Sequence, residues 1–254
     1  MISVVIIARN EAHIIGCTLQ SLQGLTDDVL VVDNGSTDGT QQICRQYQSR
    51  VIETTWQGYG PTKNIGIAAA RYDWILNLDA DEAIDENLKQ ELLLLPLQNE
   101  QEVFEMRFKN FFTGQWIRHG EWGNDRHIRL FNRKSIQWNN AAVHENLTSS
   151  GTTKRTLLKG HILHYTAHSV AKYEEKTIAY AQLNARKYFE QGKRPNLLKE
   201  YFSPLFSFVQ NYFIRLGFLD GSAGFIIARN TARYTWLKYK YLRQLYKTDN
   251  LQEA

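Results

Sequence analysis

Short, almost purely apolar runs recur along the first third of the chain and constrain its fold more than any other feature. They lack the polar alternation of a strand with one wet face and are typical of parallel strands buried on both faces. Segments with helical spacing of apolar residues lie between them. The predicted strands are Ile2–Ala8, Val29–Val32, Arg50–Glu53 and Tyr72–Leu78, and the predicted helices are Glu11–Leu22, Thr40–Tyr47 and Thr62–Ala70. This alternation predicts an α/β fold with a mostly parallel sheet.

Acidic residues follow the ends of two of these strands. Asp33 and Asp38 come after the second strand, and Asp79-Ala80-Asp81 comes after the last. Because ligands of parallel α/β sheets bind outside the carboxyl ends of the strands, we expect these acids along one edge. Two carboxylates one residue apart suit a hard divalent cation that also holds phosphate oxygens. An isolated pair is more often a solvated turn, and Asp38 fits a helix N-cap better than a binding role.

The rest of the chain changes character twice. Residues 103–140 are rich in aromatic residues in an alternating pattern, which predicts antiparallel strands. Helical spacing returns from Ser169 to Gly192, and from Leu197 onward the pattern predicts two amphipathic helices with a break near 217–224. A chain of 254 residues, 43% of them hydrophobic, can form one large domain or one domain with an appendage.

The cysteines and the apolar segment at the N-terminus indicate which cellular compartment the protein is compatible with. Cys17 and Cys44 both fall in helical patterns, so we expect buried free thiols and neither a disulfide framework nor a zinc site. The first apolar run is not expected to be a secretory signal. No basic stretch precedes it, and Arg9-Asn10-Glu11 interrupts it too early. A reducing compartment is compatible with these features.

The net charge of +4 comes from the C-terminal region. Residues 1–196 hold 22 Lys and Arg against 22 Asp and Glu, whereas residues 197–254 hold 8 against 4. The uncharged stretch Tyr201–Ile214 is shorter than the ~20 residues that span a bilayer. A transmembrane helix is therefore not expected there.

Aromatic and basic residues are mixed throughout this region. The aromatic residues are Phe206, Phe213, Phe218, Phe225, Trp236, Tyr239 and Tyr241, and the basic residues are Arg215, Arg229, Arg233, Lys238, Lys240, Arg243 and Lys247. Such helices are typical of the interface of an anionic membrane. The alternative is that the aromatic residues pack against the rest of the protein or against a second subunit.

Four motifs occur in order on the predicted elements of about residues 1–110. They are Ala8-Arg9-Asn10-Glu11, Val32-Asp33-Asn34-Gly35-Ser36-Thr37-Asp38-Gly39-Thr40, Lys63-Asn64 at the expected opening of a helix, and Leu78-Asp79-Ala80-Asp81-Glu82. Together they resemble family-2 glycosyltransferases with the GT-A fold. Less specific motifs are similar to one bacterial subgroup, the lipopolysaccharide core β-1,4-glucosyltransferases, and extend the resemblance to nearly the whole chain. These are Arg129-Leu130-Phe131, Val143-His144-Glu145, His164-Tyr165 and Phe218-Leu219-Asp220-Gly221.

The resemblance implies inverting, metal-dependent transfer of a hexose, in this subgroup glucose, from a UDP-sugar to a lipopolysaccharide core acceptor. It implies a GT-A-like fold in which residues 1–110 bind the nucleotide sugar, residues 111–196 form the acceptor-binding and catalytic half, and residues 197–254 form a helical, basic and aromatic region. The implied setting is cytoplasmic, peripheral on the inner face of the bacterial inner membrane. There the enzyme would meet a lipid-anchored glycan acceptor and an anionic surface.

The resemblance also implies a cation, Mg²⁺ or Mn²⁺, that bridges the two phosphates of the donor. Asp81 matches the residue that ligates this metal directly. Asp79 matches a residue that contacts the ribose or bridges to the metal through water. His164 is a further ligand or a phosphate contact, with a satisfied core histidine as the alternative.

Other matched residues are implied to bind the nucleotide. Asp33 matches a residue that accepts hydrogen bonds from the uracil or ribose, and Lys63 matches one that reaches the phosphates or the uracil. A guanidinium fork fits phosphate geometry, so Arg126 and Arg129 are candidates for the diphosphate, with a solvated strand face as the alternative. The remaining pocket candidates are Arg9 and Glu11, of which Glu11 also suits the first turn of a helix.

An inverting transferase needs one general base beside the acceptor oxygen. The resemblance places it in the second half of the chain, where Glu145 and Asp125 are the candidates and Glu145 is favoured. This departs from the Glu-Asp pair that many family members carry in that region.

Two alternative functions are considered. In the first, the protein is a glycosyltransferase whose acceptor is a capsule or protein glycan. In the second, it is a nucleotidyltransferase or a protein that binds a nucleotide sugar without transferring it. Nucleotidyltransferases of this architecture usually open with a Gly-rich phosphate loop, whereas Arg9-Asn10-Glu11 follows the first strand here. No nucleic-acid partner is expected, because the basic excess is confined to the tail and no nucleic-acid motif accompanies it.

Overall fold

The computed structural model describes residues 1–139, 146–149 and 151–252, and the chain forms two compact units. The first unit comprises Met1–Phe108 and Arg126–His164, and the second comprises Lys109–Asp125 and Tyr165–Ala254. The units are interleaved in sequence, so they differ from the functional division at residues 110 and 196, which stays a prediction.

Within the described residues, one sheet of nine strands has the order β3-β2-β1-β4-β8-β6-β11-β5, with β7 paired to β6. Its strands are β1 (Ile2–Ala8), β2 (Val29–Asp33), β3 (Arg50–Glu53), β4 (Trp74–Asp79), β5 (Glu82–Ile84), β6 (Glu102–Phe112), β7 (Gln115–Trp116), β8 (Arg126–Asn132) and β11 (Lys154–Ala167). A separate pair is formed by β9 (Ile136–Trp138) and β10 (Leu147–Ser149). The strands β3, β2, β1 and β4 are parallel, and β8 joins β4 in the antiparallel direction. The predicted α/β fold and the antiparallel strands after residue 103 are confirmed.

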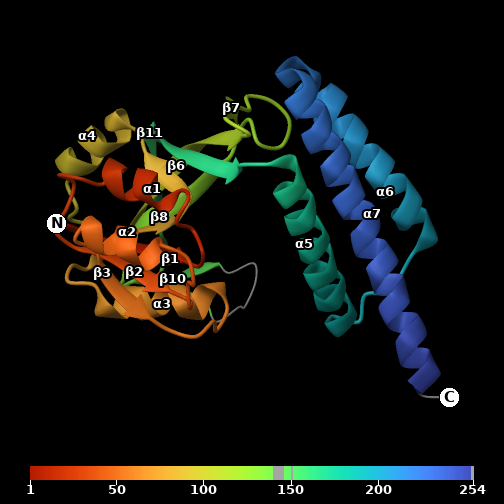
Figure 1. Ribbon diagram of the computed structural model, residues 1–254, viewed down its shortest axis with the longest axis horizontal. Helices are drawn as coiled ribbons and strands as arrows, with labels where there is room; N and C mark the ends of the chain where they lie inside the picture. The colour runs from red at the N-terminus through yellow and green to blue at the C-terminus, as the bar shows by residue number, and fades with distance from the viewer. Residues whose placement is uncertain (140–145, 150, 253–254) are drawn as a thin grey trace. The chain divides into compact units, whose positions relative to one another are not determined.

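Helices cover both faces of the parallel strands, which explains why β1 is buried along its whole length. The helices of this unit are α1 (Ile15–Ser21), α2 (Thr40–Gln46), α3 (Tyr59–Ala69) and α4 (Glu86–Leu94). Ile6 of β1 lies in the apolar core to which α1, α2 and α4 contribute, whereas Val5 lies in the core to which α3 contributes. Figure 1 shows α1 and α3 with the parallel strands between them.

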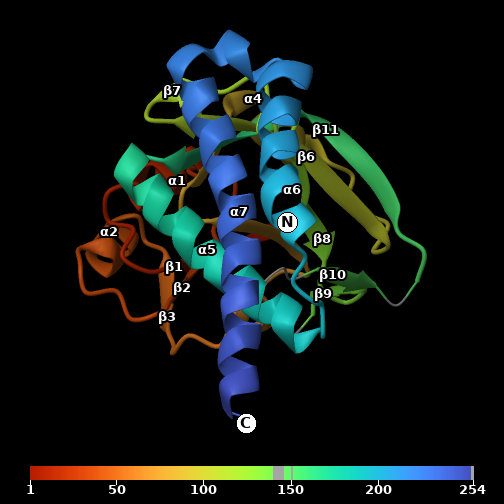
Figure 2. The same cartoon turned by 90° about the vertical axis from the view of Figure 1, so that its right-hand side faces the viewer.

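The second unit is mainly helical. Its elements are α5 (Val170–Glu190), α6 (Leu197–Val209), a π-helical turn (Gln210–Ile214), a 3₁₀ turn (Gly217–Asp220) and α7 (Gly221–Gln252). The long helix α7 packs against both α5 and α6, as Figures 1 and 2 show. A separate apolar core includes Phe112, Ile117, Ala167, Ala223 and Ile227. No helix in the described ranges is long and apolar enough to cross a membrane.

The predicted break between the two C-terminal helices is confirmed and has a packing cause. A Cβ atom at Gly224 would lie 1.8 Å from the carbonyl oxygen of Gly217, and one at Gly217 would lie 2.6 Å from that of Asn211. These close backbone approaches require glycine. Asp220 is buried beside them, and its carboxylate accepts the N–H of His119 at 2.8 Å. The motif that contains Asp220 therefore has a structural role in the second unit.

Two expectations in the first unit are corrected. Cys44 is buried as expected, but Cys17 is exposed because it lies on the outer side of the short helix α1; both thiols are free. The helix expected from Glu11 begins at Ile15. The preceding turn instead bonds to the start of α2, where Thr40 Oγ1 accepts the N–H of Glu11 at 2.9 Å.

Candidate active site

Two of the predicted acids, Asp33 and Asp79, lie at the carboxyl edge of the parallel strands. Ala8, the last residue of β1, is opposite Asp33 of β2, and Ile7 is opposite Asp79 of β4. The two aspartates therefore lie on the strands that flank β1 on either side. Ligands of sheets of this class bind at this edge.

The loops that follow β1 and β2 are tied to each other. Asn10 has a φ of 56°, in the left-handed region, and its Oδ1 accepts the N–H of Thr37 at 2.8 Å. The N–H of Asn10 donates to Ser36 Oγ at 2.9 Å. These bonds fix Asn10, which lies between the exposed Arg9 and the half-buried Glu11, the two pocket candidates of this loop.

Asp33 is fully buried, and its carboxylate accepts hydrogen bonds from its own surroundings. Ser36 donates its N–H at 3.0 Å and also its hydroxyl, and Gln41 donates its side-chain amide at 2.8 Å. Asp33 thus organises the loop that borders the edge, and its contact with a nucleotide stays a prediction.

Asp38 has the structural role expected for it, at a slightly shifted position. It precedes Gly39, the N-cap of α2, and its carboxylate accepts the N–H of Thr40 at 3.0 Å and that of Ala12 at 3.1 Å. It therefore joins the start of α2 to the loop after β1.

Asp79 lies between two cationic side chains. Lys63 Nζ is 3.7 Å from its Oδ1, and Arg129 Nη2 is 3.5 Å from its Oδ2. Burial by itself would raise the pKa of Asp79, but Lys63, Arg129 and His164 outweigh burial and lower it to about 2. The carboxylate is therefore ionised at any physiological pH, while 36% of its side chain stays exposed.

Lys63 is buried inside α3, with 3% of its side chain exposed. It was expected at the opening of this helix, but α3 begins at Tyr59, one turn earlier. A buried ammonium group needs compensating partners. The Asp79 carboxylate supplies one, and the Trp138 ring supplies another, with its centroid 4.5 Å from Lys63 Nζ.

Glu82 organises this cluster, although the sequence pattern assigns no role to it. It is 1% exposed, and it accepts Arg129 Nη2 at 2.5 Å and Arg129 Nε at 3.0 Å. It also accepts the N–H of Asp79 at 3.2 Å. A bidentate pair fixes the plane of a guanidinium group, so Glu82 sets the direction from which Arg129 meets Asp79. Its place beside the acidic motif was the available sequence signal, and the pairing of β5 with β11 makes the position buried.

His164 lies beside Asp81 in the first unit. Its Nε2 is 3.6 Å from Asp81 Oδ2, and about a fifth of each side chain is exposed. Burial lowers the pKa of His164, but Asp81, Glu82 and Asp79 together raise it above its ordinary value. Its ring also meets Phe108 edge-on, with the centroids 5.9 Å apart. The structure thus brings together Lys63, Asp79, Asp81, Arg129 and His164.

The cluster offers two carboxylates, Asp79 and Asp81, to a cation such as Mg²⁺ or Mn²⁺. Among the described residues, no group of three or more His, Cys, Asp and Glu side chains is arranged to hold a metal ion. Sites that share the ion with substrate phosphates need one or two carboxylates, and water and phosphate oxygens complete the coordination. Asp79 is ionised, and both Asp79 and Asp81 keep part of their surface exposed. The residues therefore fit an ion held jointly with a diphosphate.

The other candidates are not part of this cluster. Arg126, the first residue of β8, is exposed and lies opposite Arg107 of β6. Asp125 belongs to the second unit, where its Oδ2 accepts a hydrogen bond from Asn110 Nδ2 at 3.3 Å. Glu145 lies outside the described residues. The choice between Glu145 and Asp125 as general base stays a prediction.

Comparison with known proteins finds a matching family, similar sequences and similar solved structures. The profile of the family described as Glycosyl transferase family 2 matches residues 3–159. An uncharacterised glycosyltransferase of Rickettsia prowazekii is 28% identical over 254 residues, which cover 96% of this chain and 87% of that protein. The lipopolysaccharide core biosynthesis glycosyltransferase LpsC of Rhizobium meliloti is 28% identical over 243 residues, with 93% and 89% covered. Among solved structures, S. aureus TarS in complex with UDP matches with a TM-score of 0.46 and 18% identity, covering 96% of this chain and 91% of that one.

Proposed function

The chain belongs to glycosyl transferase family 2 and is a glycosyltransferase, and we propose that it moves glucose from UDP-glucose to an acceptor hydroxyl with inversion at the anomeric carbon. One observation carries this proposal. Asp79 is ionised at the carboxyl edge of the sheet between Lys63 and Arg129, with Asp81 and His164 beside it. A partly exposed cluster of acidic and basic side chains suits a diphosphate that arrives with a divalent ion.

Sugar transfer makes two demands on the site: the leaving diphosphate gains negative charge, and the acceptor oxygen loses a proton. Arg129 and Lys63 supply positive charge at fixed positions, so little reorganisation is needed as the sugar–oxygen bond breaks. Asp81 and Asp79 would hold Mg²⁺ or Mn²⁺, whose charge offsets that of the phosphates. Arg126 would extend the diphosphate contact along β8. The loops after β1 and β2 would bind the nucleotide through Arg9, Glu11 and Asp33.

We assign removal of the acceptor proton to Glu145, with Asp125 as the second candidate. Replacing Glu145 by Gln keeps the size of the side chain and removes its basicity. We expect turnover to fall by at least about 100-fold while UDP binding is retained. Turnover within a few-fold of the unaltered protein would transfer the assignment to Asp125.

For the acceptor we propose a sugar of the lipopolysaccharide core. The similarity to LpsC over nearly the whole chain supports this acceptor class. Such an acceptor is lipid-anchored, so the enzyme would work peripherally at the anionic, cytoplasmic face of the inner membrane. A capsule or protein glycan is the alternative acceptor, because the residues of the candidate site concern the donor.

The test is incubation with a panel of UDP-sugars and truncated core acceptors, with product detected by mass. We expect addition of one hexose from UDP-glucose, and loss of product when a chelator is added. A product formed with a capsule or protein glycan alone would replace the proposed acceptor. A different productive UDP-sugar would replace the proposed donor.

Ligand-dependent melting provides a separate test of donor binding. UDP with Mn²⁺ should raise the melting temperature, whereas nucleoside triphosphates should not. Asp81→Asn should abolish the shift, and Asp27→Asn, at an exposed acid outside the cluster, should preserve it. Absence of both transfer and a UDP-dependent shift would refute the proposal.

A further inference from the structure

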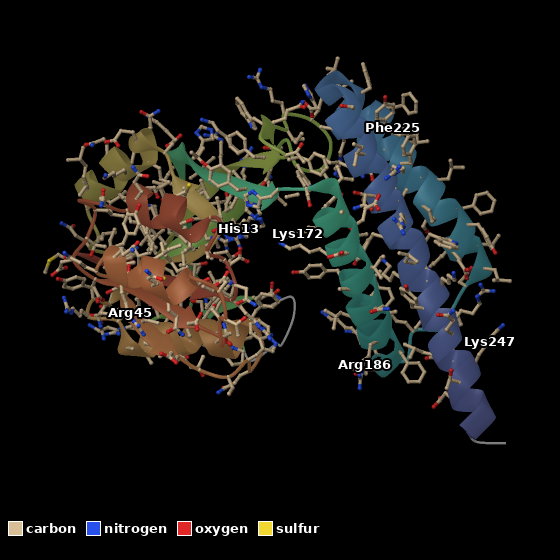
Figure 3. The ribbon with its side chains drawn as sticks, viewed as in Figure 1. His13, Arg45, Lys172, Arg186, Phe225 and Lys247 are labelled. Atoms are coloured by element: carbon tan, nitrogen blue, oxygen red, sulfur yellow. The ribbon has the colours of Figure 1, made fainter. Side chains whose placement is uncertain are left out.

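Helix α6 presents its apolar side chains to solvent and keeps a charged one inside. The exposed side chains recur with helical spacing, and each is between 37% and 68% exposed. They are Leu197, Leu198, Tyr201, Phe202, Leu205, Phe206 and Val209. Glu200 is 2% exposed and pairs with Arg243 of α7 at 2.8 Å. A typical surface helix buries its apolar side chains and exposes its charged ones, and α6 does the opposite. Figure 3 shows ring side chains projecting from α6 on the side away from α7.

The exposed apolar surface continues past the end of α6. Its further members are between 42% and 65% exposed, and they are Phe213, Ile214, Leu216, Phe218, Leu219 and Phe225. Figure 3 labels Phe225 on the first part of α7. These residues and those of α6 are here named the α6 face. A whole aromatic side chain contributes roughly 150–250 Å², so the α6 face exceeds the few hundred Å² of apolar patch usual for a soluble monomer.

The exposed charges in the part of the sequence that carries the α6 face have one sign. Between residues 191 and 228, the exposed charged side chains are all basic, and they are Lys193, Arg194, Lys199 and Arg215. The two acids of this stretch, Glu200 and Asp220, are buried and bonded to partners within the second unit. An apolar surface with cations at its margin complements the headgroups and acyl chains of anionic lipid.

We infer that the α6 face inserts into the interface of an anionic phospholipid bilayer, with Lys199 and Arg215 at the level of the lipid phosphates. This rests on the proposed function for the reason to meet a membrane, which is the lipid-anchored acceptor. The segment from Leu197 to Phe225 lies in the interface and does not cross the bilayer. A symmetric pair of α6 faces would bring like charges together, whereas anionic lipid provides the opposite charge.

The structure narrows the membrane surface expected from sequence. Trp236, Tyr239 and Tyr241 of α7 are half-buried, so the aromatic residues farther along this helix contribute to packing. Two exposed arginines of α7 are also paired within the second unit. Arg229 and Arg233 both pair with Glu174 of α5, at 2.6 and 3.3 Å. The lipid contact is therefore assigned to the α6 face, and α7 supports it from behind.

Flotation of the full chain with vesicles tests the inference. One set of vesicles contains phosphatidylethanolamine with phosphatidylglycerol, and the other contains phosphatidylcholine alone. We expect flotation with the anionic vesicles at low salt, and at least about 10-fold less protein with the neutral ones. A variant with Phe202→Gln, Leu205→Gln and Phe206→Gln should lose at least about 10-fold of the floated protein. The control replaces Leu93 and Leu94 by Gln, since these exposed leucines lie on α4, and it should float like the unaltered chain.

The outcomes separate this inference from the proposed function. Donor binding is measured on the same samples as the melting shift with UDP and Mn²⁺. Flotation without donor binding would support the membrane contact and contradict the proposed function. Donor binding without flotation would contradict the membrane contact and support the proposed function. Equal flotation of the triple variant would overturn the inference. So would a dimer that fails to float and that the triple variant dissociates, because the α6 face would then bind a second copy.

Discussion

The carboxyl edge of the sheet and the α6 face depart from the usual distribution of side chains in opposite directions. At the edge, Lys63, Glu82 and Arg129 are charged and between 91% and 99% buried. On α6, large apolar side chains are exposed, and Glu200 is buried against α7. Buried charges and exposed apolar patches are the two departures that carry information about function.

The two regions differ in whether their unusual side chains have partners within the protein. At the edge, the buried charges compensate one another, because Lys63 and Arg129 both meet Asp79 and Arg129 is held by Glu82. On the α6 face, the apolar side chains remain exposed in the part of the chain that the structure describes. Fixed, mutually compensated charges suit a small charged ligand, as proposed for the donor diphosphate, whereas a broad exposed apolar surface suits an extended partner, as inferred for the α6 face.

The largest effect is expected if the carboxyl edge of the sheet serves transfer and not only stability. Asp81→Asn should lower the rate of transfer by about 1,000-fold, as expected when a group that helps to stabilise developing charge is lost. The unfolding free energy should change by no more than about 1 kcal/mol, because Asn keeps the size of the side chain and can still accept a hydrogen bond. Steady-state kinetics with UDP-glucose and urea unfolding provide the two measurements, with Asp27→Asn as control. Activity within a few-fold of the original would contradict a functional edge.

A second substitution tests whether the edge compensates its own charges. Glu82→Gln should lower the unfolding free energy by about 3 kcal/mol, because it leaves the buried Arg129 without its acidic partner. Combining it with Arg129→Met should cost less than the sum of the two single substitutions, since the double variant has neither charge. Urea unfolding of all four proteins measures the coupling. Strictly additive effects would show that Glu82 and Arg129 do not act as a pair.

Asp28 lies at the amino ends of the parallel strands, away from the candidate site, and serves as a control acid whose role is structural. Asp28 precedes β2 and is fully buried, and it accepts hydrogen bonds from Ser3 at 2.6 Å, the N–H of Arg71 at 2.8 Å and Arg50 at 2.8 Å. Burial raises the pKa of Asp28, but these partners outweigh it and hold the pKa below its usual 3.8. Asp28→Asn should therefore cost about 2 kcal/mol of unfolding free energy at neutral pH.

The sign of its pH dependence follows from the lowered pKa. The stabilisation by Asp28 is complete above the unfolded pKa near 3.8 and is lost as the pH falls through the lower folded pKa. The difference between Asp28→Asn and the unaltered protein should thus shrink when urea unfolding is measured below about pH 4. Transfer activity per folded molecule should be unchanged. A difference that grows on acidification would contradict the assignment.

The smallest effect is expected on the α6 face. Phe202→Gln should change the unfolding free energy by no more than about 0.5 kcal/mol, because the side chain is 65% exposed. Phe112→Ala, in the core of the same unit and 1% exposed, should cost about 3–5 kcal/mol. Urea unfolding of the two variants compares them directly. A large loss from Phe202→Gln would mean that α6 packs more closely than its exposure indicates.

Much of the first unit could be predicted from local pattern. The bounds predicted for β1 and β3 coincide with those observed, and the predicted GT-A-like α/β fold is confirmed. The gathering of Asp33 and Asp79 at one edge also follows from strand order. Glu82 could not be assigned in this way, because its burial depends on the pairing of β5 with β11, far apart in sequence. The burial of Lys63 likewise depends on Trp138, from a distant segment.

Local sequence patterns were enough to predict the alternation of strands and helices, the acidic residues at the strand ends and the amphipathic character of the C-terminal helices. These features are local, because the spacing of apolar residues sets the faces of a helix or strand. Which charges pair at the edge, and which face of α6 remains exposed, became known only from the three-dimensional structure. Both depend on long-range packing, since periodicity reveals that a helix has an apolar face but not whether a neighbouring helix covers it.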